Sequence, residues 1–302
     1  MTANGAGITW PWLRRIKVTF TGLSSGGGKE FVSTGKPDGL RISARIHKTI
    51  QGIPAATNLV LYNLSGDTRG SFQRDTTKVR IEAGWDEGPK SGLVQCFYGS
   101  LLSAVHNRNG AEIVTTIHAM SMLSDLSRAD ARITREKGYP VQKIARELAS
   151  ELAPSSIIGL ETVKGTIGFC GWSYAGSVRG ALDDLAREFS FSWTCPSDGV
   201  VQFTGDPRNL GVCATIQDPY LIDLNPLLAG PLQIATGIKV RCTFEANLKP
   251  GYNLGVKSKI SPKFDGSDYR ISAVTHSLDC YTKNSFISEA VAFLPPGDAR
   301  GL

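Results

Sequence analysis

The chain contains 302 residues, of which 41% are hydrophobic and 20% are charged, and its formal net charge at pH 7 is +6. This composition is ordinary for a folded protein and excludes extensive disorder, while the length allows roughly two or three domains of about 100 to 150 residues. Because lysines and arginines are spread along the chain without a long basic block, the charge predicts weak general attraction to anions and argues against sequence-specific nucleic-acid binding.

The N-terminus and the cysteines bear on the compartment in which the chain folds. Residues 1–12 lack a basic segment followed by an apolar stretch, so the sequence predicts no signal peptide. No segment has about 18 consecutive apolar residues, so no membrane insertion is predicted. Without Cys-x-x-Cys or zinc-finger spacing, the cysteines are expected to be free core thiols of a soluble cytoplasmic product. They are Cys96, Cys170, Cys195, Cys213, Cys242 and Cys280.

From residue 14 to 122 the pattern predicts antiparallel strands. Apolar residues alternate with polar or basic ones, which is typical of a sheet with one face on a core. The alternating apolar positions are Ile16, Val18 and Phe20; Leu40, Ile42, Ala44 and Ile46; and Val79, Ile81 and Ala83. A flexible connection is predicted at Ser24–Gly28 and turns at Lys36–Gly39 and Asn107–Gly110. A short turn or helix is predicted at Ser65–Phe72, and a helix around Met120–Leu126. The segment is therefore predicted to be an all-β barrel or sandwich.

From about residue 135 to 204 the period changes to that of a helix. Val141, Ile144, Ala145, Leu148 and Leu152 predict one amphipathic helix, whose first turn tolerates Pro140 and which ends before Pro154. Ser177 is a suitable N-cap for a second helix. The apolar stripe of that helix is Val178, Leu182, Leu185, Ala186 and Phe189. A hairpin is predicted from Phe191–Thr194 and Val200–Phe203 around Pro196, Asp198 and Gly199.

The last part of the chain returns to strands. They are predicted at Ile238–Phe244, Tyr269–His276 and Ser288–Phe293, with a turn at Lys249–Gly251. No convincing repeat relates this part to the first. The order of the elements predicts an α+β protein that is mainly β, with a small α+β domain of two helices and a hairpin at 131–204 between β domains at 1–130 and 205–302.

No catalytic, cofactor-binding or metal-binding residue is predicted. The four histidines, His47, His106, His118 and His276, lie outside any hydrolase or metal motif, and we expect them to be structural. The acidic pairs Asp86-Glu87, in a turn, and Asp183-Asp184, on the solvated side of a helix, do not provide two carboxyls across a cleft. A cell-wall hydrolase is therefore the weakest alternative.

Two other features have weak functional alternatives. The glycine run within Ser24–Gly28 lacks the Lys-Ser/Thr ending of a phosphate-binding loop, so a connection between strands is expected. Single tryptophans scattered along a chain are more often core or interface anchors than a sugar-stacking platform, although a glycan-binding module stays open as the second class of function. The tryptophans are Trp10, Trp12, Trp85, Trp172 and Trp193.

The order and spacing of several segments resemble those of a known protein family. In the N-terminal part the segments are Ile42–Thr49, Leu61–Ser65, Ala83–Trp85, Phe97–Ser100 and Ile113–His118. In the C-terminal part they are Leu248–Gly251, Val256–Ser258 and Tyr269–Asp279. In this order and spacing, over roughly residues 14 to 294, the chain resembles the baseplate hub proteins of contractile-tailed bacteriophages. That family is related to the hub part of type VI secretion spike proteins.

The resemblance implies a structural virion protein and not an enzyme. Such hubs are homotrimers, and each subunit contributes two tube-like antiparallel β-barrel domains with a small α+β domain between them. The trimer joins the hexameric tail tube to the trimeric tail spike in the baseplate, and it forms part of the channel for the tape measure protein and for genomic DNA, which passes without sequence-specific binding. Assembly takes place in the host cytoplasm. No cofactor is implied, and the hub part of a type VI secretion-like spike is the alternative setting.

Overall fold

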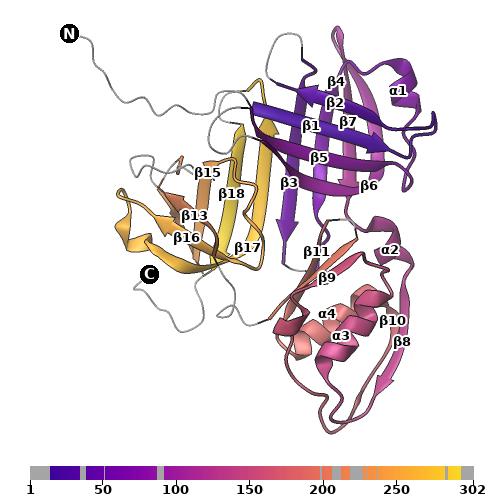
Figure 1. Ribbon diagram of the computed structural model, residues 1–302, viewed down its shortest axis with the longest axis vertical. Helices are drawn as coiled ribbons and strands as arrows, with labels where there is room; N and C mark the ends of the chain where they lie inside the picture. The colour runs from indigo at the N-terminus through magenta and orange to yellow at the C-terminus, as the bar shows by residue number, and fades with distance from the viewer. Residues whose placement is uncertain are drawn as a thin grey trace.

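The computed structural model describes residues 14–34, 39–50, 52–86, 92–197, 199–205, 212–217, 227–228, 230–235, 237–282 and 285–293. Figure 1 shows three lobes, which follow the chain from indigo through pink to yellow. Strands make up most of the first and last lobes, and the longer helices lie in the middle one. The mainly β class predicted from the sequence is confirmed.

The first lobe consists of seven strands and a short helix, α1. The elements are β1 (Arg14–Thr21), β2 (Lys29–Ser33), β3 (Ile42–Thr49), β4 (Ala56–Tyr62), α1 (Gly66–Gly70), β5 (Lys78–Trp85), β6 (Gly92–Asn109) and β7 (Glu112–Met120). In Figure 1, β1 and β5 cross in front of β3 and β4, and buried residues of all four strands belong to one core. The sheet therefore curls over itself and encloses that core.

The predicted alternation in the first lobe is confirmed. In β1, the side chains of Ile16, Val18 and Phe20 are fully buried, and the residues between them are partly exposed. The hairpin signal at Asn107–Gly110 is also correct, because Asn109 pairs with Glu112 across the turn between β6 and β7. The turn predicted at Lys36–Gly39 lies largely outside the described residues.

The middle lobe packs helices between two small sheets. Its elements are α2 (Leu123–Arg128), β8 (Asp130–Arg135), α3 (Val141–Ser150), β9 (Ser156–Ile158), η1 (Leu160–Thr162), β10 (Trp172–Ser177), α4 (Val178–Glu188), β11 (Ser192–Ser197) and β12 (Val200–Thr204). The helices α3 and α4 contact each other, and α4 contacts both the β8–β10 pair and β11. The hydroxyl of Ser177 accepts a hydrogen bond from the Gly180 amide at 3.1 Å, so the predicted N-cap is confirmed.

The third lobe is not a separate sheet. Its elements are β13 (Val212–Gln217), β14 (Leu232–Ile234), β15 (Gly237–Thr243), β16 (Asn253–Lys257), η3 (Pro262–Phe264), β17 (Gly266–Asp279) and β18 (Phe286–Phe293). The strand β17 pairs antiparallel with β3, and this pairing joins both β lobes into one sheet of 13 strands. Among the described strands no chain of pairings returns to its start, so closure of either lobe into a barrel stays a proposal.

Buried side chains form three apolar clusters. The first contains the β1–β7 residues together with Phe244, Leu278 and Phe286 from the C-terminal part of the chain. The second lies entirely within the middle lobe, and the third lies among β13–β18. Because three residues of the C-terminal part complete the first cluster, the two β lobes depend on each other for packing as well as for strand pairing.

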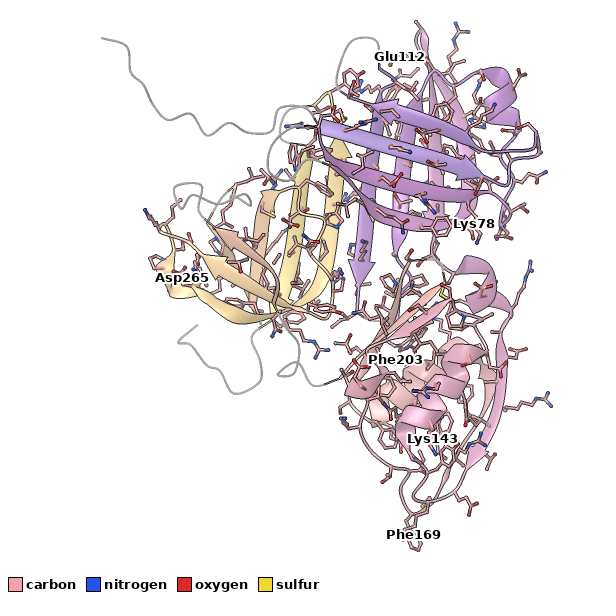
Figure 2. The ribbon with its side chains drawn as sticks, viewed as in Figure 1. Lys78, Glu112, Lys143, Phe169, Phe203 and Asp265 are labelled. Carbon is pink, nitrogen blue, oxygen red and sulfur yellow. The ribbon has the colours of Figure 1, made fainter. Side chains whose placement is uncertain are left out.

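The cysteines differ in burial. All six are free, and Cys96, Cys195 and Cys242 are buried, as expected of core thiols. Cys280 is half-buried, and burial raises the pKa of its thiol to about 11. Cys170 is exposed, so the expectation of a core thiol is wrong there. It follows Phe169, whose side chain is 85% exposed in the loop before β10 at the far end of the middle lobe (Figure 2).

Candidate functional site where three clusters meet

The histidines lie apart from one another and mostly at the surface. His47 on β3 and His106 on β6 are exposed, and the Nδ1 atom of each lies 3.1 Å from the hydroxyl of a threonine on the neighbouring strand. His118 on β7 is exposed as well. His276 on β17 is fully buried. Among the described residues, no group of three or more His, Cys, Asp or Glu side chains is arranged to hold a metal ion.

His276 is the histidine with the unusual environment. Its Nδ1 lies 2.8 Å from the Ser288 hydroxyl, and its ring packs edge-on against Phe244, while its Nε2 is buried without a hydrogen-bond partner in the described part of the chain. Burial holds the pKa of His276 well below its usual value, and the nearby Lys48 ammonium lowers it further. The ring is therefore neutral at pH 7.

This depressed pKa makes a prediction for stability against pH. Below about pH 6.5 the unfolded chain protonates this histidine and the folded chain does not, so stability should fall with decreasing pH at up to about 1.4 kcal/mol per pH unit. His276→Gln should flatten the dependence of the unfolding free energy on pH between about 6.5 and 5.5. Urea denaturation at several pH values measures both slopes, and equal slopes in the two proteins would contradict the assignment.

The acidic pairs serve local structure. Asp86 contacts the Arg15 guanidinium at 3.3 Å, and Glu87 lies outside the described residues. Asp184 contacts Arg187 one helical turn further on, at 3.3 Å. Asp183 is half-exposed and contacts Arg179 at 3.8 Å, and it also accepts a hydrogen bond of 2.8 Å from the indole of Trp193. The bond to Trp193 on β11 is a contact that helical periodicity does not reveal.

The tryptophans do not form a common surface. Trp193 is 2% exposed in the second cluster, and Trp85 packs edge-on against Phe286, with ring centroids 4.9 Å apart. Trp172 is half-buried on β10 and stacks nearly parallel to Tyr174. Trp10 and Trp12 lie outside the described residues. The described tryptophans are thus core anchors: Trp193 is buried, and the partly exposed Trp85 and Trp172 pack against the first and second clusters.

A pocket of about 370 Å³ opens where the three clusters meet. Strands β3 and β6 of the first lobe form one wall, β9, β11 and β12 of the middle lobe form another, and the segment between β15 and β16 forms the third. The lining residues are Lys48, Val94, Gln95, Cys96, Phe97, Ile158, Pro196, Ser197, Gln202, Ala246, Asn247, Lys249, Pro250 and Tyr252. We call this cavity the junction pocket.

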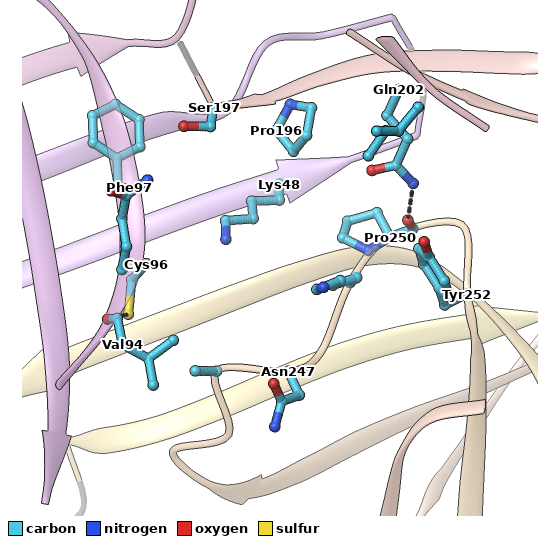
Figure 3. Close-up of a pocket in the computed structure, with 14 residues that line it drawn as sticks. Lys48, Val94, Cys96, Phe97, Pro196, Ser197, Gln202, Asn247, Pro250 and Tyr252 are labelled. Atoms are coloured by element: carbon cyan, nitrogen blue, oxygen red, sulfur yellow. Dashed lines mark hydrogen bonds between the residues drawn. The ribbon is translucent and has the colours of Figure 1, made fainter. Parts of the chain in front are cut away.

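Lys48 lies at the centre of the junction pocket, between Cys96 and Phe97 on one side and Pro250 and Tyr252 on the other (Figure 3). The side-chain amide of Gln202 donates a hydrogen bond of 3.2 Å to the carbonyl of Pro250, which ties the middle lobe to the third wall. Burial lowers the pKa of Lys48, and the neighbouring charge of Lys249 lowers it further.

The alternation in β3 contains a sequence signal for this pocket. Ile42, Ala44 and Ile46 are buried on one face of β3, and Lys48 continues the same alternation. A lysine in register with core residues indicates that the core opens at that point or that the charge meets a partner. The other walls of the pocket come from distant segments, so the site becomes visible only in the folded chain.

The comparisons with known proteins identify the fold. No family model and no curated protein sequence matches the chain. Among solved structures, a tail protein from Neisseria meningitidis matches with a TM-score of 0.58 at 10% identity, over 93% of this chain and 97% of that one. The prophage MuSo2 tail protein from Shewanella oneidensis matches with a TM-score of 0.58 at 10% identity, over 93% and 98%.

A third structure extends the fold beyond phages. An Escherichia coli component of the type VI secretion system, described as structurally similar to the T4 bacteriophage tail proteins gp27 and gp5, matches with a TM-score of 0.55 at 11% identity, over 87% of this chain and 76% of that one. The chain thus has the fold of phage tail proteins and related type VI secretion components. The resemblance to the baseplate hub family is confirmed at the level of fold. Within the described residues, no helix is long and apolar enough to cross a membrane.

Proposed function

We propose that this chain is a structural tail protein that forms the trimeric hub of a baseplate. The observation that carries the proposal is the fold, which matches tail proteins from two bacterial genomes over 93% of this chain and nearly all of theirs. A likeness over the whole length supports a shared architecture and not only a shared module. In this proposal the chain is not an enzyme, and its location is the virion tail.

The proposed trimer would join a hexameric tail tube to a trimeric spike. Each subunit would supply two tube-like β domains, with domain boundaries near residues 130 and 204, and its partners would be the tube or distal tube protein, the spike and the tape measure protein. Support for two repeating β units comes from the separate first and third clusters on one continuous sheet. DNA would pass through the lumen without sequence-specific contacts.

Light scattering coupled to size exclusion tests the proposal with the full chain. We expect a particle of three times 32.4 kDa, with a central hole in negative-stain images. Because some assemblies form only on a partner, the measurement is repeated with a trimeric tail spike present. A chain that stays monomeric under both conditions would contradict the hub.

Two other functions are supported by particular observations. The E. coli type VI secretion component has the same fold, which supports the hub part of a secretion spike as an alternative setting. The stacked and partly exposed Trp172 and Tyr174 rings support a glycan-binding tail module more weakly. Binding of a sugar from a broad panel, lost in Trp172→Ala, would favour the glycan module over the hub.

A further inference from the structure

The described residues that line the junction pocket carry an unbalanced positive charge. They include Lys48 and Lys249 and no aspartate or glutamate. Among the described residues, the Lys48 side chain has no hydrogen bond or ion pair, and the other side chains on its face of β3 are those of Ile42, Ala44 and Ile46. Glu245 directly precedes the third wall of the pocket in the sequence. It is 3% exposed, and its carboxylate accepts a hydrogen bond of 3.0 Å from the backbone amide of Asn247.

Two ionisable groups near Lys48, His276 and Cys96, are neutral at pH 7. His276 lies directly across from Ile46 in the β17–β3 pairing, so it is a diagonal neighbour of Lys48 on the same face of the sheet. Cys96, on β6 in the same wall as Lys48, has a pKa raised to about 11 and stays a neutral thiol. The described ionisable groups that face Lys48 from β6, β17 and the third wall are Cys96, His276 and Lys249, and they are therefore neutral or cationic.

The rest of the lining is divided between polar and apolar groups. Ser197 and Asn247 offer side-chain hydrogen-bond donors near the two lysines. Val94 and Ile158 are 47% and 39% exposed, which is unusual for large aliphatic side chains next to three buried clusters. A bare inorganic anion would pair with the lysines and leave these aliphatic groups in water. A ligand with an apolar body would cover them as well.

We propose that the junction pocket binds a carboxylate carried on a small apolar body, with Lys48 and Lys249 as its cationic partners. A free short carboxylic acid and the C-terminus of a peptide share this chemistry. The occupant would contact all three clusters at once, because each wall of the pocket belongs to a different lobe. This inference is independent of the hub proposal and stands or fails separately from it.

N-acetyl-leucine is a suitable probe, and N-acetyl-leucinamide is its neutral match. We expect N-acetyl-leucine to produce saturable NMR shifts in the full chain at pH 7 and to raise its melting temperature, while the amide does neither. Lys48→Met and Lys249→Met should each weaken binding by at least about tenfold, which corresponds to about 1.4 kcal/mol. Lys48→Arg should retain most of the affinity. Lys257→Met, an exposed position outside the pocket lining, is the matched control and should bind like the unmodified chain.

Several outcomes would overturn this assignment. They are equal binding of the neutral amide, undiminished binding by both methionine variants, and tighter binding of inorganic phosphate than of N-acetyl-leucine. If Lys48→Met fails to fold, Lys249→Met decides the question, because Lys249 is exposed and its removal leaves the core intact. Binding of a peptide C-terminus but not of the free acid would identify a polypeptide as the source of the carboxylate.

Discussion

Val18→Asp should abolish stable folding of the β lobes. The Val18 side chain is fully buried in the first cluster, between Phe31 of β2 and Ile81 of β5 in the strand pairing. An aspartate there would bury a charge without a partner, at a cost of roughly 4 kcal/mol or more. That is a large fraction of the roughly 5–15 kcal/mol by which a domain is stable. Urea denaturation followed by circular dichroism, together with the yield of soluble protein, measures the loss.

A matched control exists one residue further along β1. Thr19 is on the opposite face of the strand and is half-buried between Glu30 of β2 and Arg80 of β5. Thr19→Asp places the same carboxylate beside one charge of each sign, so the expected change is under about 1 kcal/mol. Lys17 is a poorer control because it contacts both Glu30, at 2.8 Å, and Glu82, at 3.9 Å. Equal loss of stability in Val18→Asp and Thr19→Asp would show that the two faces of β1 are wrongly assigned.

Leu182→Ala should destabilise the middle lobe by about 2–5 kcal/mol. The Leu182 side chain is fully buried on α4 in the second cluster, so its truncation leaves a cavity that the surrounding side chains fill only in part. Because this cluster contains only residues of the middle lobe, we expect one unfolding step to shift while the step of the joined β lobes stays in place. Differential scanning calorimetry resolves the two steps.

The control for this prediction is on the same helix. Asp184 is half-exposed and contacts only Arg187 among the described residues, so Asp184→Ala should change stability by less than about 1 kcal/mol. A single transition that shifts as a whole in Leu182→Ala would mean that all three lobes unfold together. In that case, residues 131–204 would not be an independent domain.

The fold also bears on the distribution of charge. The outer face of β1 carries Lys17 between two glutamates, and Arg15 contacts Asp86, so basic side chains there are paired with acidic ones. The net charge of +6 is therefore not concentrated on this face. In the proposed ring, such paired charges would limit the attraction of a wall to DNA that passes it.

The sequence by itself determined the local elements and their buried faces. The alternation of Ile16, Val18 and Phe20 identifies the core face of β1, because successive side chains of a strand point to opposite sides. The Ser177 cap and the spacing of Leu182 and Leu185 identify α4 for an equally local reason. The mainly β class followed from these elements, and the family resemblance from their order.

Only the tertiary structure decided which strands pair and which segments surround the junction pocket. Alternation shows which face of β3 is buried, but it contains no information on its partner, and the pairing with β17 joins residues more than 200 positions apart. The contact of Asp183 with Trp193 and the junction pocket around Lys48 arise in the same way, from segments that meet only when the lobes pack. Periodicity predicts which face of one segment is buried. A site between lobes depends instead on contacts between segments that are far apart in the sequence and come together only in the folded chain.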